Sequence, residues 1–218
     1  MPVPAQPKIY RIVHVDRLPS IIAAGQMLSD SEMLKTPLGG TNIGMDKIKA
    51  RRLNELKLSC HQNLYIGQCV PFYFCPRSIM LYLIHMRNPE LTYQGGQQPI
   101  VHLEADLHAA IAWAQANDRR WAFTLSNAGA YYFEDRCDLA RLGDINWDAV
   151  NARQWSGNGV SRLIKEGKQA EFLIEQAFPW RLVERIGVFS QSYVSPVSNA
   201  MQGAAHRPRI EIRREWYY

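Results

Sequence analysis

The chain has 218 residues and a formal net charge of +5, from 25 lysines and arginines against 20 aspartates and glutamates. Apolar residues make up 47% of it and charged residues 21%, a globular composition that excludes a wholly disordered chain. No apolar run approaches the roughly 20 residues that span a bilayer, and the N-terminus resembles no secretory signal. We therefore expect one cytoplasmic domain over residues 1–218, with a mild charge that permits a polyanionic partner without requiring one.

The first quarter of the chain predicts a strand, a helix, a loop and a second helix. Residues 8–14 carry the β-branched and aromatic side chains typical of a strand. A short helix is expected from Leu18 to Gly25, where glycine ends it. The polar stretch over residues 29–44 predicts a long surface loop, and such loops are often functional.

A basic helix is predicted from Asp46 to Leu56. It carries four cations within two turns, Lys47, Lys49, Arg51 and Arg52, which repel one another in an isolated helix. A solvated basic face is one interpretation of this cluster, and a site for phosphate groups is the other.

The remaining elements alternate between apolar runs and turns. Strands are predicted at residues 70–74, 99–103, 121–125 and 210–213, helices at 77–85 and 107–117, and an irregular polar segment at 134–167. Apolar content resumes at residues 169–174 and 182–186. This order predicts an α+β fold, with one sheet as the core and helices packed outside it. Because no glycine-rich turn joins a strand to a helix, neither a Rossmann nor a P-loop fold is supported.

The four cysteines show no CxxC spacing, and we expect reduced thiols. Cys60 and His61 could form a metal cluster with Cys69, but the spacings match no common zinc pattern. No metal site is therefore expected.

Two titratable residues stand where chemistry is plausible. His14 ends the first predicted strand, and its neutral imidazole could either hold a ribose hydroxyl or serve as an ordinary core residue. Glu171 follows a polar segment of about 40 residues, which is long for a structureless connection and suggests a region that grips a substrate. Alternatively, Glu171 is a carboxylate that opens a regular element and has no further function.

Several separated segments share their order and spacing with one protein family. They are YRIVH at residues 10–14, DRLPSII at 16–22, NIG at 42–44 with KARR at 49–52, VPFYFCPRS at 70–78 and KQAE at 168–171, with weaker support from AGAYY at 128–132 and DINW at 144–147. Together they resemble the DarT family of DNA ADP-ribosyltransferase toxins, from about residue 8 to the C-terminus. Each motif alone is weak, but the ordered combination is specific.

The resemblance implies an ADP-ribosyltransferase fold, in which a split antiparallel sheet core holds NAD⁺ in a central cleft. It further implies a toxin that moves ADP-ribose from NAD⁺ onto a base of single-stranded DNA, releases nicotinamide and blocks replication. Its partner would be a macrodomain-type antitoxin that removes the mark, and the toxin itself would be a monomer. The NAD⁺-binding part would lie at about residues 8–56 and the substrate loop region at about residues 128–171.

The resemblance also assigns roles to single residues. Glu171 matches the catalytic glutamate, and Arg51 matches the arginine assigned to catalysis and cofactor binding, with a register that Arg52 leaves uncertain by one residue. The other residues expected at the NAD⁺ site are Ile12, Val13, His14 and Asn42.

Contacts to DNA are expected from side chains in or near the substrate loop region. Aromatic rings could stack on bases and cations could neutralise phosphates; these residues are Tyr131, Tyr132, Trp147, Arg153, Lys165 and Lys168. The tryptophan could equally be a core residue, because its ring can bury a large area.

The chain departs from the thymidine-modifying members at three places. They often read Phe-Thr-Pro where this chain has Phe74-Cys75-Pro76, and they have a tyrosine where it has Lys168. Their segment before the glutamate is typically rich in arginine and aspartate, whereas residues 156–167 of this chain are not. Thymine and guanine therefore both stay open as the target base. Two other functions stay open as well: an ADP-ribosyltransferase acting on RNA or protein, and a non-catalytic nucleic-acid-binding domain.

Overall fold

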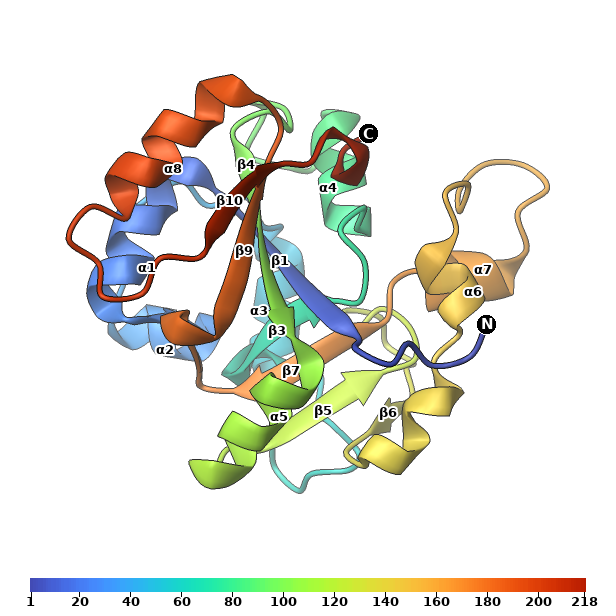
Figure 1. The fold of residues 1–218 in the computed structure, drawn as a ribbon. Coiled ribbons are helices and arrows are strands. Elements are labelled where there is room, and N and C mark those ends of the chain that lie inside the picture. Colours follow the sequence, from blue (N-terminus) through green and yellow to red (C-terminus); the bar gives the residue numbers. More distant parts are fainter.

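An eight-stranded sheet forms the centre of the computed structural model, which describes residues 1–218 (Figure 1). Across the sheet the strands are β10 (Arg209–Ile212), β9 (Val183–Val188), β4 (Ile100–Asp106), β1 (Lys8–His14), β3 (Cys69–Tyr73), β7 (Glu171–Glu175), β5 (Trp121–Thr124) and β6 (Asp135–Arg136). A separate two-stranded sheet pairs β2 (Gln26–Leu28) with β8 (Ala177–Pro179).

The large sheet is split between β1 and β3. β1 pairs with β4 along its whole length, through seven residue pairs, but it meets β3 only where Tyr10 lies opposite Tyr73. Beyond this pair the two strands separate, and the Arg11 guanidinium bridges the opening with a 2.9 Å hydrogen bond to the Pro71 carbonyl. All pairs are antiparallel except β9 with β10. The predicted α+β fold with a split antiparallel sheet is therefore confirmed.

Eight α-helices surround the sheet. They are α1 (Leu18–Ala24), α2 (Asp30–Lys35), α3 (Asp46–Asn54), α4 (Ile79–His85), α5 (Leu107–Ala116), α6 (Trp147–Asn151), α7 (Arg162–Gly167) and α8 (Val194–Ala200). In Figure 1, α1, α2 and α8 lie together on one side, whereas α6 and α7 lie on the other side with β6. No helix combines the length and apolar character that a membrane crossing requires.

Aromatic rings from neighbouring strands fill the main core. Phe72 on β3 lies 4.5 Å from Phe178 and 6.3 Å from Phe172, measured between ring centroids, and all three side chains are fully buried. Burying each of these rings stabilises the fold by about 2–3 kcal/mol. The core therefore fixes the position of β7, whose first residue is Glu171.

Local capping explains two differences from the elements that the sequence predicts. Residues 29–44 are not one loop, because the buried Ser29 accepts a hydrogen bond from the Glu32 N–H and starts α2. The segment over residues 134–167 is not wholly irregular either, because Asn146 and Ser161 cap α6 and α7 in the same way. Such short helices carry too few apolar residues to show a clear period.

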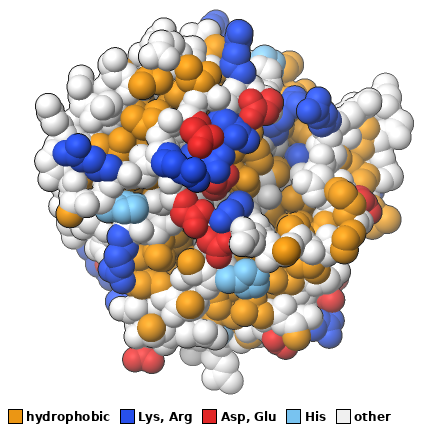
Figure 2. All heavy atoms as spheres, in the orientation of Figure 1, with side chains coloured by type: hydrophobic (Ala, Val, Ile, Leu, Met, Phe, Trp, Pro, Cys, Tyr) orange, Lys and Arg blue, Asp and Glu red, His pale blue; other side chains and the backbone are white.

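Acidic and basic side chains gather on the face of the molecule that Figures 1 and 2 present to the viewer. Figure 2 shows acidic and basic side chains together at the centre of this face, over β4, β9 and β10. There Arg185 pairs with Glu104 and Glu211, and Arg213 pairs with Glu211 and Glu215. These cations are neutralised by their neighbours, so this face does not present an unbalanced positive charge to a polyanion.

Candidate active site

A cavity of about 450 Å³ opens where β1 and β3 separate. Ile12 and Val13 from β1, Tyr73 from β3 and Glu171 from β7 all line it. Much of the remaining lining is apolar, and basic side chains from β1, the α1 start and α3 complete it: Arg11, Arg17, Lys49 and Arg52. An apolar cleft with a few convergent charged groups is the typical form of a small-molecule site.

Glu171 is held in the wall of this cavity by contacts from three segments. Its side chain is only 2% exposed, and its carboxylate forms an ion pair with the Arg52 guanidinium of α3. The other carboxylate oxygen accepts a 3.1 Å hydrogen bond from the Ala128 N–H, and the Glu171 N–H donates to the Thr124 hydroxyl at 3.1 Å. The carboxylate therefore has a fixed position and a fixed orientation.

The ion pair sets the protonation state of its surroundings. Burial alone lowers the pKa of Arg52, but the charge and hydrogen bond of Glu171 outweigh burial and raise it. Burial raises the pKa of Tyr73 well above its ordinary value, and the nearby Glu171 carboxylate adds to this effect. Arg52 therefore stays a cation and Tyr73 stays neutral at physiological pH. The Arg52 Nε atom is buried and has no partner in the protein, so it can donate to a substrate.

The structure pairs Arg52, and not Arg51, with Glu171, of the two arginines that the motif register left open. Successive residues on an α-helix point about 100° apart, so only one of the two can face the cavity. Arg51 instead donates to the Gly129 carbonyl, and its guanidinium carbon lies 4.7 Å from the centroid of the Tyr131 ring.

The residues expected at the NAD⁺ site do not all reach the cavity. Ile12, Val13 and Asn42 line it, whereas His14 does not. The His14 Nδ1 atom lies 2.8 Å from the Asp16 carboxylate, which also binds the Thr41 hydroxyl and N–H at 2.6 and 2.9 Å. His14 thus supports the segment over residues 41–45 that lines the cavity, rather than facing the cavity itself.

Two cavity arginines were not expected from the sequence. Burial lowers the pKa of Arg11 to about 10, and its Nε atom has no partner in the protein. Arg17 packs against Gly40, where a Cβ atom would come within 2.5 Å of the Arg17 side chain. The available signal was an arginine in the middle of an apolar strand, since arginine is seldom buried without a reason.

A second cavity, of about 850 Å³, adjoins the first at Asn127, which lines both. The Asn127 side chain is fixed because its amide N–H donates to the Gln169 side-chain oxygen, Oε1, at 2.9 Å and its own oxygen accepts from the Gly129 N–H at 2.6 Å. Tyr131 and Tyr132 line this cavity and are 65% and 93% exposed. The second cavity therefore leads from exposed aromatic rings toward the segment that holds Glu171.

Two of the residues expected to contact DNA lie in the core instead. Trp147 is 4% exposed, and its indole N–H donates to the Leu142 carbonyl at 2.9 Å. Lys168 is also 4% exposed, and its ammonium donates to the Val150 and Ala152 carbonyls at 2.7 and 2.9 Å. Both side chains are committed to internal contacts, which corrects the expectation that they face a nucleic acid.

The remaining two expected cations are closer to solvent. Arg153 is exposed and Lys165 is half-buried on α7. Neither lines the second cavity, whose basic side chains are Lys57 and Arg162. They can therefore meet a long polyanion only outside the cavity itself.

The split sheet matches the ADP-ribosyltransferase fold that the sequence motifs imply, and comparisons with known proteins agree. The family model described as "DarT: ssDNA thymidine ADP-ribosyltransferase, DarT" matches residues 10–218, and the chain belongs to this family. It is 36% identical over 220 residues to a DNA ADP-ribosyl transferase of Thermus sp. (strain 2.9), covering 99% of this chain and 98% of the relative. A DNA ADP-ribosyl transferase of Escherichia coli O127:H6 is 27% identical, with 99% and 95% covered.

Solved structures of relatives have the same fold. Thermus sp. 2.9 DarT in complex with ADP-ribosylated ssDNA matches with a TM-score of 0.89 and 34% identity, covering 100% of this chain and 99% of that one. The same Thermus protein in complex with NAD⁺ matches with a TM-score of 0.83 and 32% identity over all of both chains. Thermosipho africanus DarTG in complex with ADP-ribose shares the fold at 17% identity, with a TM-score of 0.71, over 97% of this chain and 51% of that one.

Proposed function

We propose that this chain transfers ADP-ribose from NAD⁺ to a base of single-stranded DNA and releases nicotinamide. One observation carries the proposal: the fixed, buried carboxylate of Glu171 lines the first cavity and is bound by the Ala128 N–H, next to Asn127, which lines both this cavity and the aromatic-rimmed second one. Support comes from the relative at 34% identity that was solved with ADP-ribosylated ssDNA. In this proposal residues 8–56 supply most of the NAD⁺ site, and residues 128–171 supply the DNA site.

The first cavity suits NAD⁺ because it combines apolar walls with cations. Planar guanidinium groups bind phosphate oxygens through paired hydrogen bonds, and Arg11 and Arg17 both line the cavity. The unpartnered Nε atom of Arg11 is a buried donor that a diphosphate can satisfy. Ile12 and Val13 give apolar contact for the ring systems of the dinucleotide.

The reaction breaks the bond between nicotinamide and the ribose C1′ atom and forms a new bond from C1′ to the base. Nicotinamide leaves as a neutral molecule, and the base gives up one proton. Positive charge develops on the ribose in the transition state, and a fixed carboxylate such as Glu171 stabilises that charge. Arg52 keeps this carboxylate oriented through their ion pair. Because its pKa is raised, Arg52 cannot take the proton of the base and acts through its charge.

The second cavity suits a base that has left the stack. A base inside a duplex cannot bring its ring atoms to the ribose, so the acceptor is single-stranded or flipped out. Tyr131 and Tyr132 present exposed rings on which bases can stack. Arg51 supports this surface because it lies against the Tyr131 ring.

Thymine is the favoured target base, because the family description names thymidine. Two of the three departures from the family wording, Cys75 and Lys168, do not bear on this choice. Both are buried, and the Lys168 ammonium lies within hydrogen-bonding reach of the Cys75 thiol. They therefore change one contact inside the core and do not line either cavity.

A direct test uses oligonucleotides that carry one thymine or one guanine among adenines. Each is incubated with NAD⁺ and the protein, and its intact mass is measured. We expect the thymine oligonucleotide to gain one ADP-ribose. Gain by the guanine oligonucleotide alone would contradict the choice of base, and gain by RNA or protein alone would support the other acceptors. Salt-sensitive binding of the oligonucleotide without consumption of NAD⁺ would support the alternative of a non-catalytic nucleic-acid-binding domain.

Toxicity and its control belong to the same proposal. Modified template bases block replication, so we propose a toxin that acts as a monomer in the cytoplasm and has a macrodomain-type antitoxin as partner. The DarTG relative, of which this chain matches 51%, is consistent with such a pairing. Expression of the wild-type chain should stop DNA synthesis, whereas Glu171→Gln should not; arrest by both would separate toxicity from transfer.

A further inference from the structure

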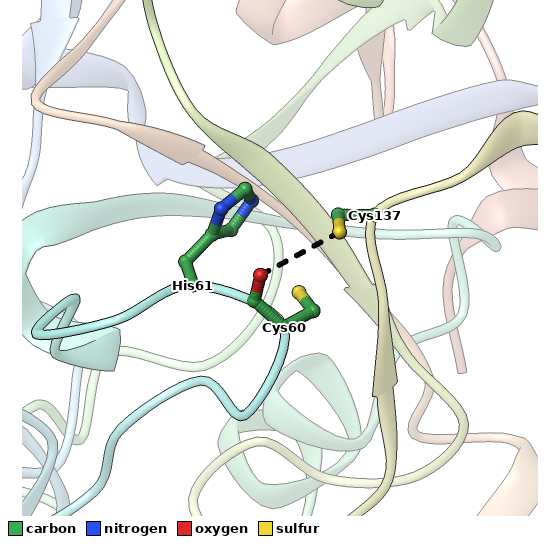
Figure 3. Close-up of side chains that lie close together, drawn as sticks. All are labelled: Cys60, His61 and Cys137. Atoms are coloured by element: carbon green, nitrogen blue, oxygen red, sulfur yellow. Dashed lines mark hydrogen bonds between the residues drawn. The ribbon is translucent and has the colours of Figure 1, made fainter.

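Three potential metal ligands meet at one place outside both the NAD⁺ site and the DNA surface. Cys60 and His61 lie in the loop between α3 and β3, and Cys137 follows β6; one ligand atom from each lies within 4.8 Å of the other two (Figure 3). All the cysteines are free thiols. Cys69, which the sequence suggested as the third ligand, is buried in β3 with its sulfur 3.9 Å from the Tyr65 carbonyl.

The thiol of Cys137 and the imidazole of His61 have few competing contacts. The Cys137 thiol lies near the Cys60 thiol and 3.7 Å from the Cys60 carbonyl, which is the dashed line in Figure 3. The His61 Nε2 atom lies 2.8 Å from the Trp121 carbonyl. A carbonyl can only accept, so Nε2 donates to it, and Nδ1 is the ring nitrogen left to bind a metal. Metal-binding histidines typically have their second nitrogen fixed by a carbonyl in this way.

The loop that carries two of the ligands is fixed to the strand that precedes the third. The Asp135 carboxylate of β6 accepts hydrogen bonds from the Ser59 N–H and hydroxyl, both at 2.9 Å, and from the Cys60 N–H at 2.8 Å. Leu58 and Leu64 anchor the loop in the core, at 4% and 0% exposure. Asp135 thus supports the cluster, with both oxygens already engaged, and is not needed as a ligand.

We propose that Cys60, His61 and Cys137 bind one Zn²⁺ ion, with water in the fourth position. Two thiolates and an imidazole are the donors that zinc prefers, and hard cations such as Mg²⁺ avoid. Ligand atoms around a tetrahedral zinc ion lie about 3.8 Å apart, so a cluster already within 4.8 Å closes with side-chain movements of about 1 Å.

The ion would stabilise one wall of the second cavity, the proposed DNA site, without lining that cavity. Ser59 and Asp135 line the second cavity, and both lie directly beside the cluster. Zinc therefore ties one wall of this cavity to the loop between α3 and β3 and stabilises the fold there. It takes no part in the transfer reaction, and the site stands whether or not the proposed transfer activity is found.

The test is the metal content of the untagged full-length chain. The protein is equilibrated with Zn²⁺ and a phosphine reductant and freed of unbound metal by gel filtration. Its zinc content per chain is then measured by inductively coupled plasma mass spectrometry. We expect about one zinc per chain for the wild type and for Cys69→Ala, a matched buried cysteine outside the cluster. Cys60→Ser and Cys137→Ser should each lose about 100-fold or more in zinc affinity.

A second measurement guards against variants that do not fold. Circular dichroism reports folding, and Zn²⁺ should raise the Tm of the wild type and of Cys69→Ala but not of the two serine variants. Three results would overturn the proposal. They are a wild-type chain without retained zinc, equal zinc content in a folded Cys60→Ser/Cys137→Ser double variant, and a Cys60–Cys137 disulfide that forms in air despite equimolar Zn²⁺.

Discussion

The two adjoining cavities are built in different ways. The first, of about 450 Å³, lies in the opening of the sheet, and its charged groups Arg52 and Glu171 are buried and paired. The second, of about 850 Å³, is bordered by loops and α7, and its aromatic rings Tyr131 and Tyr132 stand in solvent. The first suits a substrate that must be held in one geometry, whereas the second suits a flexible strand that brings its own base.

The difference follows from what supports each cavity. Strands cannot shift without breaking their pairing, so the split between β1 and β3 gives a rigid site. Loops carry fewer fixed contacts and adapt to their ligand. Asn127 and Ala128 join the two, because Asn127 lines both cavities and the Ala128 N–H binds the Glu171 carboxylate. Substitutions on the two sides should therefore affect different kinetic parameters.

The largest effect is expected from Glu171→Gln. The amide keeps the size and much of the hydrogen bonding but removes the charge that stabilises the ribose cation, so kcat should fall by about 10³-fold. The matched control is Glu175→Gln at the other end of β7, whose carboxylate pairs with Arg120 away from both cavities. Transfer rates with single-stranded DNA measure both variants; near-normal turnover in a folded Glu171→Gln protein would remove Glu171 from catalysis.

The next effect compares the two neighbouring arginines. Arg52→Lys keeps a cation but loses the forked donor that orients Glu171, so we expect kcat to fall by about 100-fold with little change in KM for DNA. Arg51→Lys should instead raise KM for DNA by less than about tenfold, because it disturbs only the Tyr131 surface. Steady-state kinetics separate the two, and the reverse pattern would restore Arg51 as the catalytic arginine.

A smaller effect is expected on the exposed aromatic rim. Tyr132→Ala removes a stacking surface, so KM for single-stranded DNA should rise by about tenfold while KM for NAD⁺ stays unchanged. Ile212→Ala, an exposed apolar residue at the opposite edge of the sheet, is the control. Equal KM values for DNA in the wild type and Tyr132→Ala would mean that bases do not stack there.

The cations near the second cavity should change only the salt dependence of DNA binding. Arg153→Glu removes an exposed cation, so the slope of log Kd against log salt should decrease by about one. Lys168→Met should leave this slope unchanged, since the Lys168 ammonium is bound to two carbonyls inside the protein. Fluorescence anisotropy at several salt concentrations measures both slopes; a reduced slope for Lys168→Met would mean that DNA reaches this amine.

The last prediction concerns the pH dependence of stability, which should leave transfer activity least affected. It involves a core residue that borders neither cavity. Burial lowers the pKa of His102 to about 4, while its Nε2 atom lies 3.0 Å from the Pro76 carbonyl. Between pH 6.5 and 4 the unfolded chain binds more protons than the folded one, so stability should fall as the pH falls, by about 3 kcal/mol in total. Urea unfolding should show a shallower pH dependence for His102→Leu. Identical slopes would contradict a neutral buried His102.

The chain order of strands and the family motifs predicted much of this protein. Residues 8–14 form a strand as expected, and the Glu171 of the KQAE motif is the first residue of β7. Arg11 and Arg17 were missed, because nothing local tells whether a cation near an apolar strand faces solvent or a cavity. The DNA contacts expected of Trp147 and Lys168 fail for a related reason: both side chains lie in the core, which for Trp147 is the alternative that the sequence left open.

The sequence by itself determined most of the elements and the family, because local residue patterns and the order of motifs can be read without knowing any tertiary contact. Only the tertiary structure decided that Arg52, rather than Arg51, meets Glu171 across 119 residues of chain. It also brought Cys137 beside Cys60 and His61, a grouping that no spacing pattern contains. Contacts of this kind depend on how strands and loops pack, which sets both the direction and the burial of each side chain.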